Sequence, residues 1–139
     1  MLRVVVDPNV VVSAAISPGG VTGRLVRLGL AGQFRMVVCP MLLEEASDAL
    51  SRPKLQRFVS NDAALELLAD IEGAAETHPD PAVIHAISRD PDDDYLVALA
   101  TESGADRLVS GDAGLLALAS HDSRIQSPRM LLDELTGEV

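Results

Sequence analysis

Two aspartates directly follow short apolar runs, at positions where a ligand site could form. Asp7 ends the run at residues 2–6, which is apolar apart from Arg3, and Asp112 follows the apolar pair at 108–109 by three positions. If both runs are strands of one parallel sheet, their carboxyl ends share a rim, and ligands bind beyond that rim. Each aspartate also has an ordinary structural alternative, a helix N-cap for Asp7 and a turn residue for Asp112.

A third carboxylate lies on a predicted helix at residues 41–51. The apolar residues of this segment form one stripe, and at about 100° per residue Glu45 falls at the edge of that stripe. Glu44 and Asp48 point away from it. Glu45 is therefore placed to lean over the rim, although most glutamates at such an edge only solvate a helix face.

The acidic run at residues 90–94 contributes a fourth carboxylate. At helical spacing Asp93 aligns with the inward apolar residues that follow it, whereas Asp94 points outward. Geometry alone does not separate Asp92 from Asp93. Carboxylates in the first turn of a helix also stabilise it by about 0.3–1 kcal/mol each through the helix dipole. We assign that role to Asp90, Asp92 and Asp94.

Four carboxylates on one rim would repel one another unless a cation joined them or some were protonated. Oxygen-only ligands suit Mg²⁺ or Mn²⁺. Zinc is not indicated, because Cys39 is the only cysteine and the histidines are scattered, at His78, His85 and His121. A nucleotide-binding loop is not indicated either, since neither G-x-x-x-x-G-K-S/T nor G-x-G-x-x-G occurs.

The composition bounds the kinds of partner and compartment. The chain has 139 residues, 47% of them hydrophobic, which predicts a single domain over residues 1–139. A net charge of −10 repels nucleic acid and anionic membranes at long range, so a polyanionic substrate would need a cation bridge or a local basic strip. No stretch approaches the roughly 18 apolar residues of a membrane span, and Asp7 and Pro8 interrupt the N-terminal run too early for a signal peptide. The expected compartment is the cytoplasm.

Short β-branched runs alternate with longer helical stretches along the chain. This alternation predicts a three-layer α/β/α sandwich around a central, mainly parallel sheet. The predicted strands are residues 2–6, 34–39, 82–87, 107–110 and 124–126. The predicted helices are residues 9–16, 22–31, 41–51, 61–76, 90–103, 112–118 and 128–135.

Four segments, in this order, resemble a PIN domain: VVVDPNVVVSA at 4–14, PMLLEEASDALSRPKL at 40–55, DPDDDYLVALA at 90–100 and LVSGDAGLL at 108–116. Their order and spacing are similar to those of the VapC-like toxin ribonucleases of bacterial toxin–antitoxin pairs. The resemblance implies an α/β/α sandwich whose acidic residues bind Mg²⁺ or Mn²⁺ and hydrolyse RNA phosphodiester bonds. A metal-bound water would attack the phosphorus, leaving a 5′-phosphate and a 3′-hydroxyl.

Matched position by position, the resemblance assigns the catalytic and metal-binding carboxylates to Asp7, Glu45, Asp93 and Asp112. Asn9 and Ser110 match supporting polar positions that orient ligands or a bound water. The chain departs from the family pattern at two places. Family members often have threonine where Pro8 stands, and often an acidic residue where Gly114 stands. The second departure bears on a second metal site more than on the first.

The resemblance further implies an RNA substrate and a cognate antitoxin protein, whereas a homodimer is expected from the apolar helix content alone. Arg52, Lys54 and Arg57 form the densest basic cluster and are candidates for RNA binding, although an ordinary solvated surface is the stronger explanation. Arg24 and Arg27 form the next densest basic cluster. The apolar residues at 21–30 and 41–50 could support either the dimer or the antitoxin.

Two other functions fit parts of the sequence. A haloacid-dehalogenase-like phosphatase also has a carboxylate ending its first strand and a late Gly-Asp motif. It needs an aspartate where Asn9 stands, however, and the only lysine, Lys54, lies far before the late acidic motifs. The alternative from a different class is a non-catalytic PIN-fold binding module, against which the four matching carboxylates argue. Metal-dependent cleavage of RNA, compared with hydrolysis of a small phosphomonoester, separates the three functions.

Overall fold

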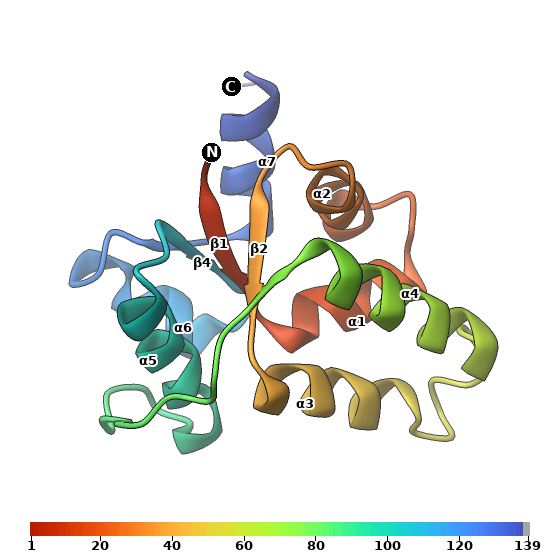
Figure 1. Ribbon diagram of the computed structural model, residues 1–139, viewed down its shortest axis with the longest axis horizontal. Helices are drawn as coiled ribbons and strands as arrows, with labels where there is room; N and C mark the ends of the chain where they lie inside the picture. The colour runs from red at the N-terminus through yellow and green to blue at the C-terminus, as the bar shows by residue number, and fades with distance from the viewer. Residues whose placement is uncertain (138–139) are drawn as a thin grey trace.

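The computed structural model describes residues 1–137 and places a five-stranded sheet at the centre of the molecule (Figure 1). Its strands are β1 (Arg3–Val6), β2 (Arg35–Val38), β3 (Glu76–Thr77), β4 (Arg107–Val109) and β5 (Ile125–Gln126). They follow the order β3-β2-β1-β4-β5, and each neighbouring pair runs parallel. The predicted parallel sheet is confirmed.

Helices cover both faces of this sheet. On one side α1 (Pro8–Ile16), α2 (Val21–Leu30), α3 (Pro40–Leu50) and α4 (Asn61–Ala74) pack on one another, and α7 (Pro128–Thr136) packs on α2 (Figure 1). On the other side α5 (Asp94–Ser103) packs on β1 and β4, and α6 (Ala113–Leu116) follows the end of β4. Two short 3₁₀ helices, η1 (Pro91–Asp93) and η2 (Ala117–Ser120), adjoin α5 and α6. These three layers confirm the predicted α/β/α sandwich.

The core is built from aliphatic side chains on both sides of the sheet. Val4 and Val5 of β1 have no exposed surface, as expected of a strand covered on both faces. Leu25 of α2 and Leu99 of α5 are buried within the same cluster. Cys39 is fully buried in the same cluster, where it packs as a small hydrophobic residue. The single domain over 1–139 stays a prediction, and residues 138–139 lie outside the described part of the chain.

The third strand is not where the sequence predicted it. Residues 82–87 form no strand, and β3 instead pairs with β2, with Val37 opposite Glu76. The amides of Ala82 and Val83 donate to the two carboxylate oxygens of Glu102 on α5, at 3.1 and 3.3 Å. Because these amides donate hydrogen bonds to a side chain of α5, residues 82–87 do not pair with a strand. Helix α4 also ends two residues earlier than predicted, which releases Glu76 into the sheet.

The helix predicted from residue 90 begins differently. Asp90 caps the 3₁₀ turn η1 by accepting a hydrogen bond from the Asp92 amide at 3.0 Å, and α5 begins only at Asp94. A 3₁₀ turn advances about 120° per residue, so the side-chain directions predicted for the acidic run are shifted. The other predicted elements agree with the structure to within two residues at each end.

Candidate active site

The strand order brings Asp7 and Asp112 to the same rim. β1 and β4 are neighbours, with Val6 opposite Val109, and the sheet grows outward from this pair in both directions. Such a switch point opens a crevice at the carboxyl ends of the strands. Asp7 caps α1 by accepting from the Asn9 amide at 2.8 Å, and Asp112 caps α6 by accepting from the Leu115 amide at 2.9 Å. Both aspartates therefore fill the ordinary capping role and also lie at the rim.

Ser110 links these two aspartates. Its side chain is fully buried, and its hydroxyl donates to Oδ2 of Asp7 at 2.7 Å. The Oγ of Ser110 in turn accepts a hydrogen bond from the Asp112 amide at 2.9 Å. Asn9 is exposed and contributes its backbone amide to Asp7. Both predicted supporting residues thus contact the first aspartate, Ser110 through its side chain and Asn9 through its backbone.

Glu45 and Asp93 belong to the same electrostatic environment. Burial raises the pKa of the Glu45 carboxyl, and the charges of Asp7, Asp92 and Asp90 raise it further. Burial likewise raises the pKa of Asp93 to about 7, and the charges that add to this shift are those of Asp7, Asp112, Asp90 and Glu45. We refer to the four residues predicted from the sequence as the acidic cluster: Asp7, Glu45, Asp93 and Asp112.

Asp7 lies deepest in the acidic cluster. It has no exposed surface, and burial raises the pKa of its carboxyl, as does the charge of Asp112. The hydrogen bonds from Asn9 and Ser110 oppose that shift by favouring the ionised form. A buried carboxylate with two donors and further carboxylates nearby is poorly accommodated without a cation.

A hard divalent cation fits the donor chemistry of the acidic cluster. Its ligating atoms are all carboxylate oxygens, the donors that Mg²⁺ and Mn²⁺ prefer, and the mutual repulsion of the carboxylates is what a cation would relieve. Within residues 1–137, however, no three His, Cys, Asp or Glu side chains are arranged as a set ready to hold a metal ion. The donors are gathered in one region, and the side chains would have to move closer together to bind the ion.

The remaining acidic residues of the run do not behave alike. Asp94 was expected to point outward into solvent, and that expectation is wrong: its side chain is 2% exposed. Its Oδ1 accepts hydrogen bonds from the amide and the hydroxyl of Ser88, at 2.8 and 2.6 Å, and from the Ile87 amide at 3.3 Å. The chain before η1 folds back over α5, which the local pattern could not show. Asp92 is exposed, as a first-turn residue should be.

Of the predicted RNA-binding residues, one is electrostatically connected to the acidic cluster. Arg52, Lys54 and Arg57 are all exposed and follow the end of α3. The charge of Arg52 opposes the rise in the pKa of Glu45, so its guanidinium lies within electrostatic reach of that carboxylate. The guanidinium of Arg57 instead lies over the Phe58 ring, 5.8 Å from its centroid.

Gly114 stands where related sequences were expected to carry an acidic residue. A Cβ placed on Gly114 would lie 3.0 Å from Oδ2 of Asp112. A side chain here would therefore press directly on the fourth carboxylate. Its absence leaves the acidic cluster with one carboxylate fewer on this side, which is consistent with the expectation that a second cation would be less well held.

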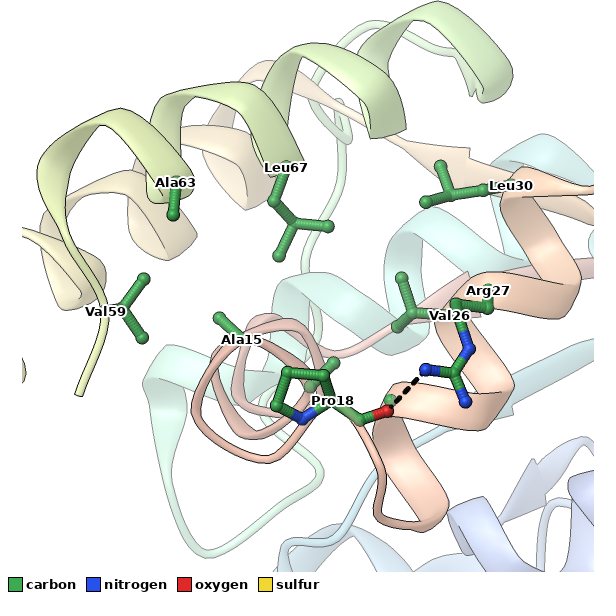
Figure 2. A pocket seen from close by; sticks show the side chains of 10 residues that line it. Ala15, Pro18, Val26, Arg27, Leu30, Val59, Ala63 and Leu67 are labelled. Carbon is green, nitrogen blue, oxygen red and sulfur yellow. Dashed lines mark hydrogen bonds between the residues drawn. The ribbon is translucent and has the colours of Figure 1, made fainter.

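An apolar groove of about 220 Å³ lies between α1, α2 and α4, apart from the acidic cluster (Figure 2). Its walls include Ala15, Val26 and Leu67, and Arg27 lies at its side, donating to the Pro18 carbonyl oxygen at 2.9 Å. The groove reaches α1 at Ala14, seven residues after Asp7, which corresponds to about 10 Å along a helix.

The apolar residues at 41–50 provide less free surface than the sequence suggested. Leu42, Ala46 and Leu50 are almost completely buried in the protein's own interior. Met41 remains 38% exposed at the start of α3. The apolar residues of this helix therefore mostly serve the core, because the stripe that the sequence shows faces the rest of the fold.

Tyr95 is a polar group near the acidic cluster that the sequence reasoning did not select. Burial raises the pKa of its phenol, and the charges of Glu45, Cys39, Asp7 and Asp93 add to that effect. One signal in the sequence points to it: the only tyrosine of the chain directly follows the acidic run. Because aliphatic residues follow it at 96–100, the local pattern predicts a core residue at this position.

The chain was also compared with known proteins. It matches the family model described as "PIN domain" over residues 3–114. The uncharacterized protein MJ1680 of Methanocaldococcus jannaschii is 26% identical over 125 residues, which make up 90% of this chain and 80% of that protein. The crystal structure of PAE2754 from Pyrobaculum aerophilum has a similar fold, with a TM-score of 0.67 and 18% identity, covering 98% of this chain and 90% of that one. In the part of the chain that the structure describes, no helix is long and apolar enough to cross a bilayer.

Proposed function

The chain belongs to the PIN domain family, and on this basis we propose that it is a Mg²⁺- or Mn²⁺-dependent endoribonuclease. PIN domains are generally metal-dependent nucleases. The observation that carries the proposal is the raised pKa of Asp93, about 7, because the charges that add to it include those of the other three matched carboxylates. In this proposal, residues from four separate segments act as one site at the rim of the sheet.

In this proposal Asp7, Glu45, Asp93 and Asp112 hold the cation. When bound, the cation would polarise the phosphoryl oxygens and lower the pKa of a water nucleophile. Asp7 is held for this task by the Asn9 amide and the Ser110 hydroxyl, and Ser110 also fixes the backbone that carries Asp112. These contacts maintain the first and fourth carboxylates at the rim whether or not a cation is present.

The substrate in this proposal is RNA. The net charge of −10 opposes the approach of a polyanion, so local cations must guide the phosphates. Arg52 is the strongest candidate, because its charge already acts on Glu45. Lys54 and Arg57 would extend the basic surface along the turn that follows α3.

We further propose that the protein is the toxin of a toxin–antitoxin pair, similar to VapC, and acts in the cytoplasm. A toxin of this kind needs a cognate antitoxin that shields the acidic cluster from RNA. The apolar groove between α1, α2 and α4 could receive an apolar segment of that partner (Figure 2). A homodimer of single-domain protomers is also proposed, with the exposed Met41 at the start of α3 available to it.

A non-catalytic PIN-fold module is the second candidate function. It is favoured by one observation, namely that the described residues contain no three acidic, histidine or cysteine side chains already arranged to hold an ion. In such a protein the acidic cluster would be a remnant, and binding of a partner would be the task.

The deciding experiment combines calorimetric metal titration with cleavage of a structured RNA in Mg²⁺, in Mn²⁺ and in excess chelator. The ribonuclease proposal expects saturable metal binding and cleavage that the chelator abolishes, both lost in Asp93→Asn and retained in Asp62→Asn, whose carboxylate is exposed on α4. A folded protein that neither binds metal nor cleaves RNA would favour the binding module. Hydrolysis of p-nitrophenyl phosphate in place of RNA would favour the phosphatase.

A further inference from the structure

The four carboxylates of the acidic cluster are not equally well oriented. Asp7 accepts two hydrogen bonds and Asp112 accepts one. Glu45 and Asp93 accept none from residues 1–137. Carboxylates that ligate metals are usually held by hydrogen bonds from surrounding groups, which fix their orientation and strengthen binding. Half of the proposed ligands therefore lack such a contact.

A buried donor without a partner lies beside them. Tyr95, in the first turn of α5, is only 4% exposed, and its hydroxyl makes no hydrogen bond to the described residues. A buried hydroxyl left unpaired costs about 1–3 kcal/mol, so such groups in native proteins generally have a partner in the working state. Glu45, Asp7 and Asp93 are among the groups whose charges act on this phenol, so Tyr95 lies within electrostatic reach of the acidic cluster.

Glu45 is the acceptor that best fits this donor. It is first among the charged groups that act on Tyr95, and its carboxylate is free of hydrogen bonds to the described residues. Asp7 already has its two donors. Glu45 is half-buried and reaches the rim through a flexible side chain, so a rotamer change can move its carboxylate toward the phenol.

We propose that Tyr95 is a positioning residue, whose hydroxyl donates a hydrogen bond to the carboxylate of Glu45 when a divalent cation draws the acidic cluster together. The inference rests on the proposed function, because it requires the cation. Tyr95 touches neither the substrate nor the ion and acts only through Glu45. Its role is to orient a ligand that no other described donor holds.

The chain provides its own spectroscopic probe for this contact. Tyr95 is the only tyrosine, and tryptophan is absent, so tyrosine emission from the protein reports on this one phenol. The emission of a phenol is quenched when its hydroxyl donates to a carboxylate. Titration with Mg²⁺, which is diamagnetic, should lower the emission along a saturable curve whose midpoint equals that of the calorimetric titration. The same titration of Glu45→Gln should leave the emission nearly unchanged.

The variant Tyr95→Phe tests how much the proposed hydrogen bond contributes to metal affinity. Its affinity for Mn²⁺ should fall by about 10–100-fold, the usual effect of removing a hydrogen bond to a metal ligand. Its unfolding midpoint in chelator should equal or exceed that of the parent, because the substitution removes a buried hydroxyl that has no partner without the cation. In a Glu45→Gln background, Tyr95→Phe should cause no further loss of affinity.

The outcomes separate this inference from the proposed function. If the parent binds Mg²⁺ in the calorimeter while tyrosine emission stays constant and Tyr95→Phe binds Mn²⁺ like the parent, the role of Tyr95 is wrong and the metal site stands. A lower unfolding midpoint of Tyr95→Phe in chelator would also overturn it, by showing a structural partner. If the parent binds neither ion, the proposed function fails and the inference fails with it.

Discussion

The hydroxyl of Ser110 donates to Oδ2 of Asp7 over 2.7 Å and joins two residues that are 103 positions apart in the chain. The Oγ of Ser110 also accepts a hydrogen bond from the Asp112 amide. This one buried side chain therefore fixes both the first and the fourth carboxylate of the acidic cluster. The contact is possible because β1 and β4 are parallel neighbours that end at the same rim. The sheet topology is thus what creates the site.

Replacing Asp7 by asparagine should remove the charge and keep the shape. The amide oxygen can still accept from the Asn9 amide, and the amide nitrogen can donate to Ser110 Oγ. We expect Mn²⁺ binding to weaken at least tenfold and RNA cleavage to be nearly abolished. In chelator the variant should be at least as stable as the parent, since one of several repelling charges is gone. Calorimetry, a cleavage assay and thermal unfolding measure the three quantities. Parent-like binding and cleavage would show that Asp7 is not a ligand.

Ser110→Ala should uncouple the two aspartates. The substitution leaves Oδ2 of Asp7 and the Asp112 amide without their shared partner, so the free energy of unfolding should fall by about 1–3 kcal/mol. The Mn²⁺ concentration needed for half-maximal cleavage should rise. Ser103→Ala is the control, because its hydroxyl makes only a 3.5 Å contact at the end of α5. If urea unfolding showed an equal loss in the free energy of unfolding for Ser110→Ala and Ser103→Ala, the coupling would be contradicted.

The raised pKa of Asp93 predicts how stability depends on pH in chelator. The folded pKa is about 7, whereas an aspartate in an unfolded chain titrates near 4, so between these values the folded state binds the proton more tightly. Its contribution to stability is present below about pH 4 and is lost as the pH rises through about 7. The free energy of unfolding of Asp93→Asn should fall less over this pH range. At about pH 8 it should exceed that of the parent by ~1 kcal/mol, a figure that allows for solvent screening of this half-exposed carboxyl. Thermal unfolding at both ends of the window measures this, with the exposed Asp92→Asn as control. An unchanged pH slope in Asp93→Asn would contradict the shift.

The local sequence pattern predicted the structure correctly where interactions between neighbouring residues determine it. A β-branched run followed by aspartate and proline predicted the end of β1, because proline cannot continue a ladder. The helix predicted from Asn9 begins one residue earlier, at Pro8, since proline suits a first helical turn. The half-buried position of Glu45 also followed from helical spacing alone. These features depend on neighbours within a few residues.

Features that depend on distant contacts could not be read in this way. Residues 82–87 have a strand-like composition. Their first and last amides nevertheless donate hydrogen bonds to the carboxylates of Glu102 and Asp94 on α5. Asp94 was misplaced for the same reason, since its partners at 87–88 reach it only after the chain folds back. The short strand β3 is defined by its pairing with β2, and two residues carry no periodic signal.

Asp94→Asn should therefore lower the stability of the protein. The charged acceptor of the Ser88 amide and hydroxyl would be lost, and hydrogen bonds to charged groups contribute about 1.5–3 kcal/mol each. We expect a lower unfolding midpoint and faster proteolytic cleavage within residues 82–89, with mass spectrometry locating the cut. Asp92→Asn, in the same run but exposed, should behave like the parent. Protection of residues 82–89 in Asp94→Asn would show that other contacts hold this segment.

Arg52 should contribute to RNA binding more than other exposed arginines. Its charge acts on Glu45, whereas Arg35 is exposed at the start of β2, on the opposite rim of the sheet. Arg52→Ala should raise KM for RNA severalfold, leave kcat largely unchanged, and reduce the slope of log affinity against log salt by about one, as expected on losing one phosphate contact. Arg35→Ala alters the net charge equally and should change neither quantity appreciably. Filter binding in chelator and cleavage kinetics in Mn²⁺, each at several salt concentrations, provide the measurements. Equal effects in the two variants would mean that only the overall charge matters and that Arg52 does not contact the RNA.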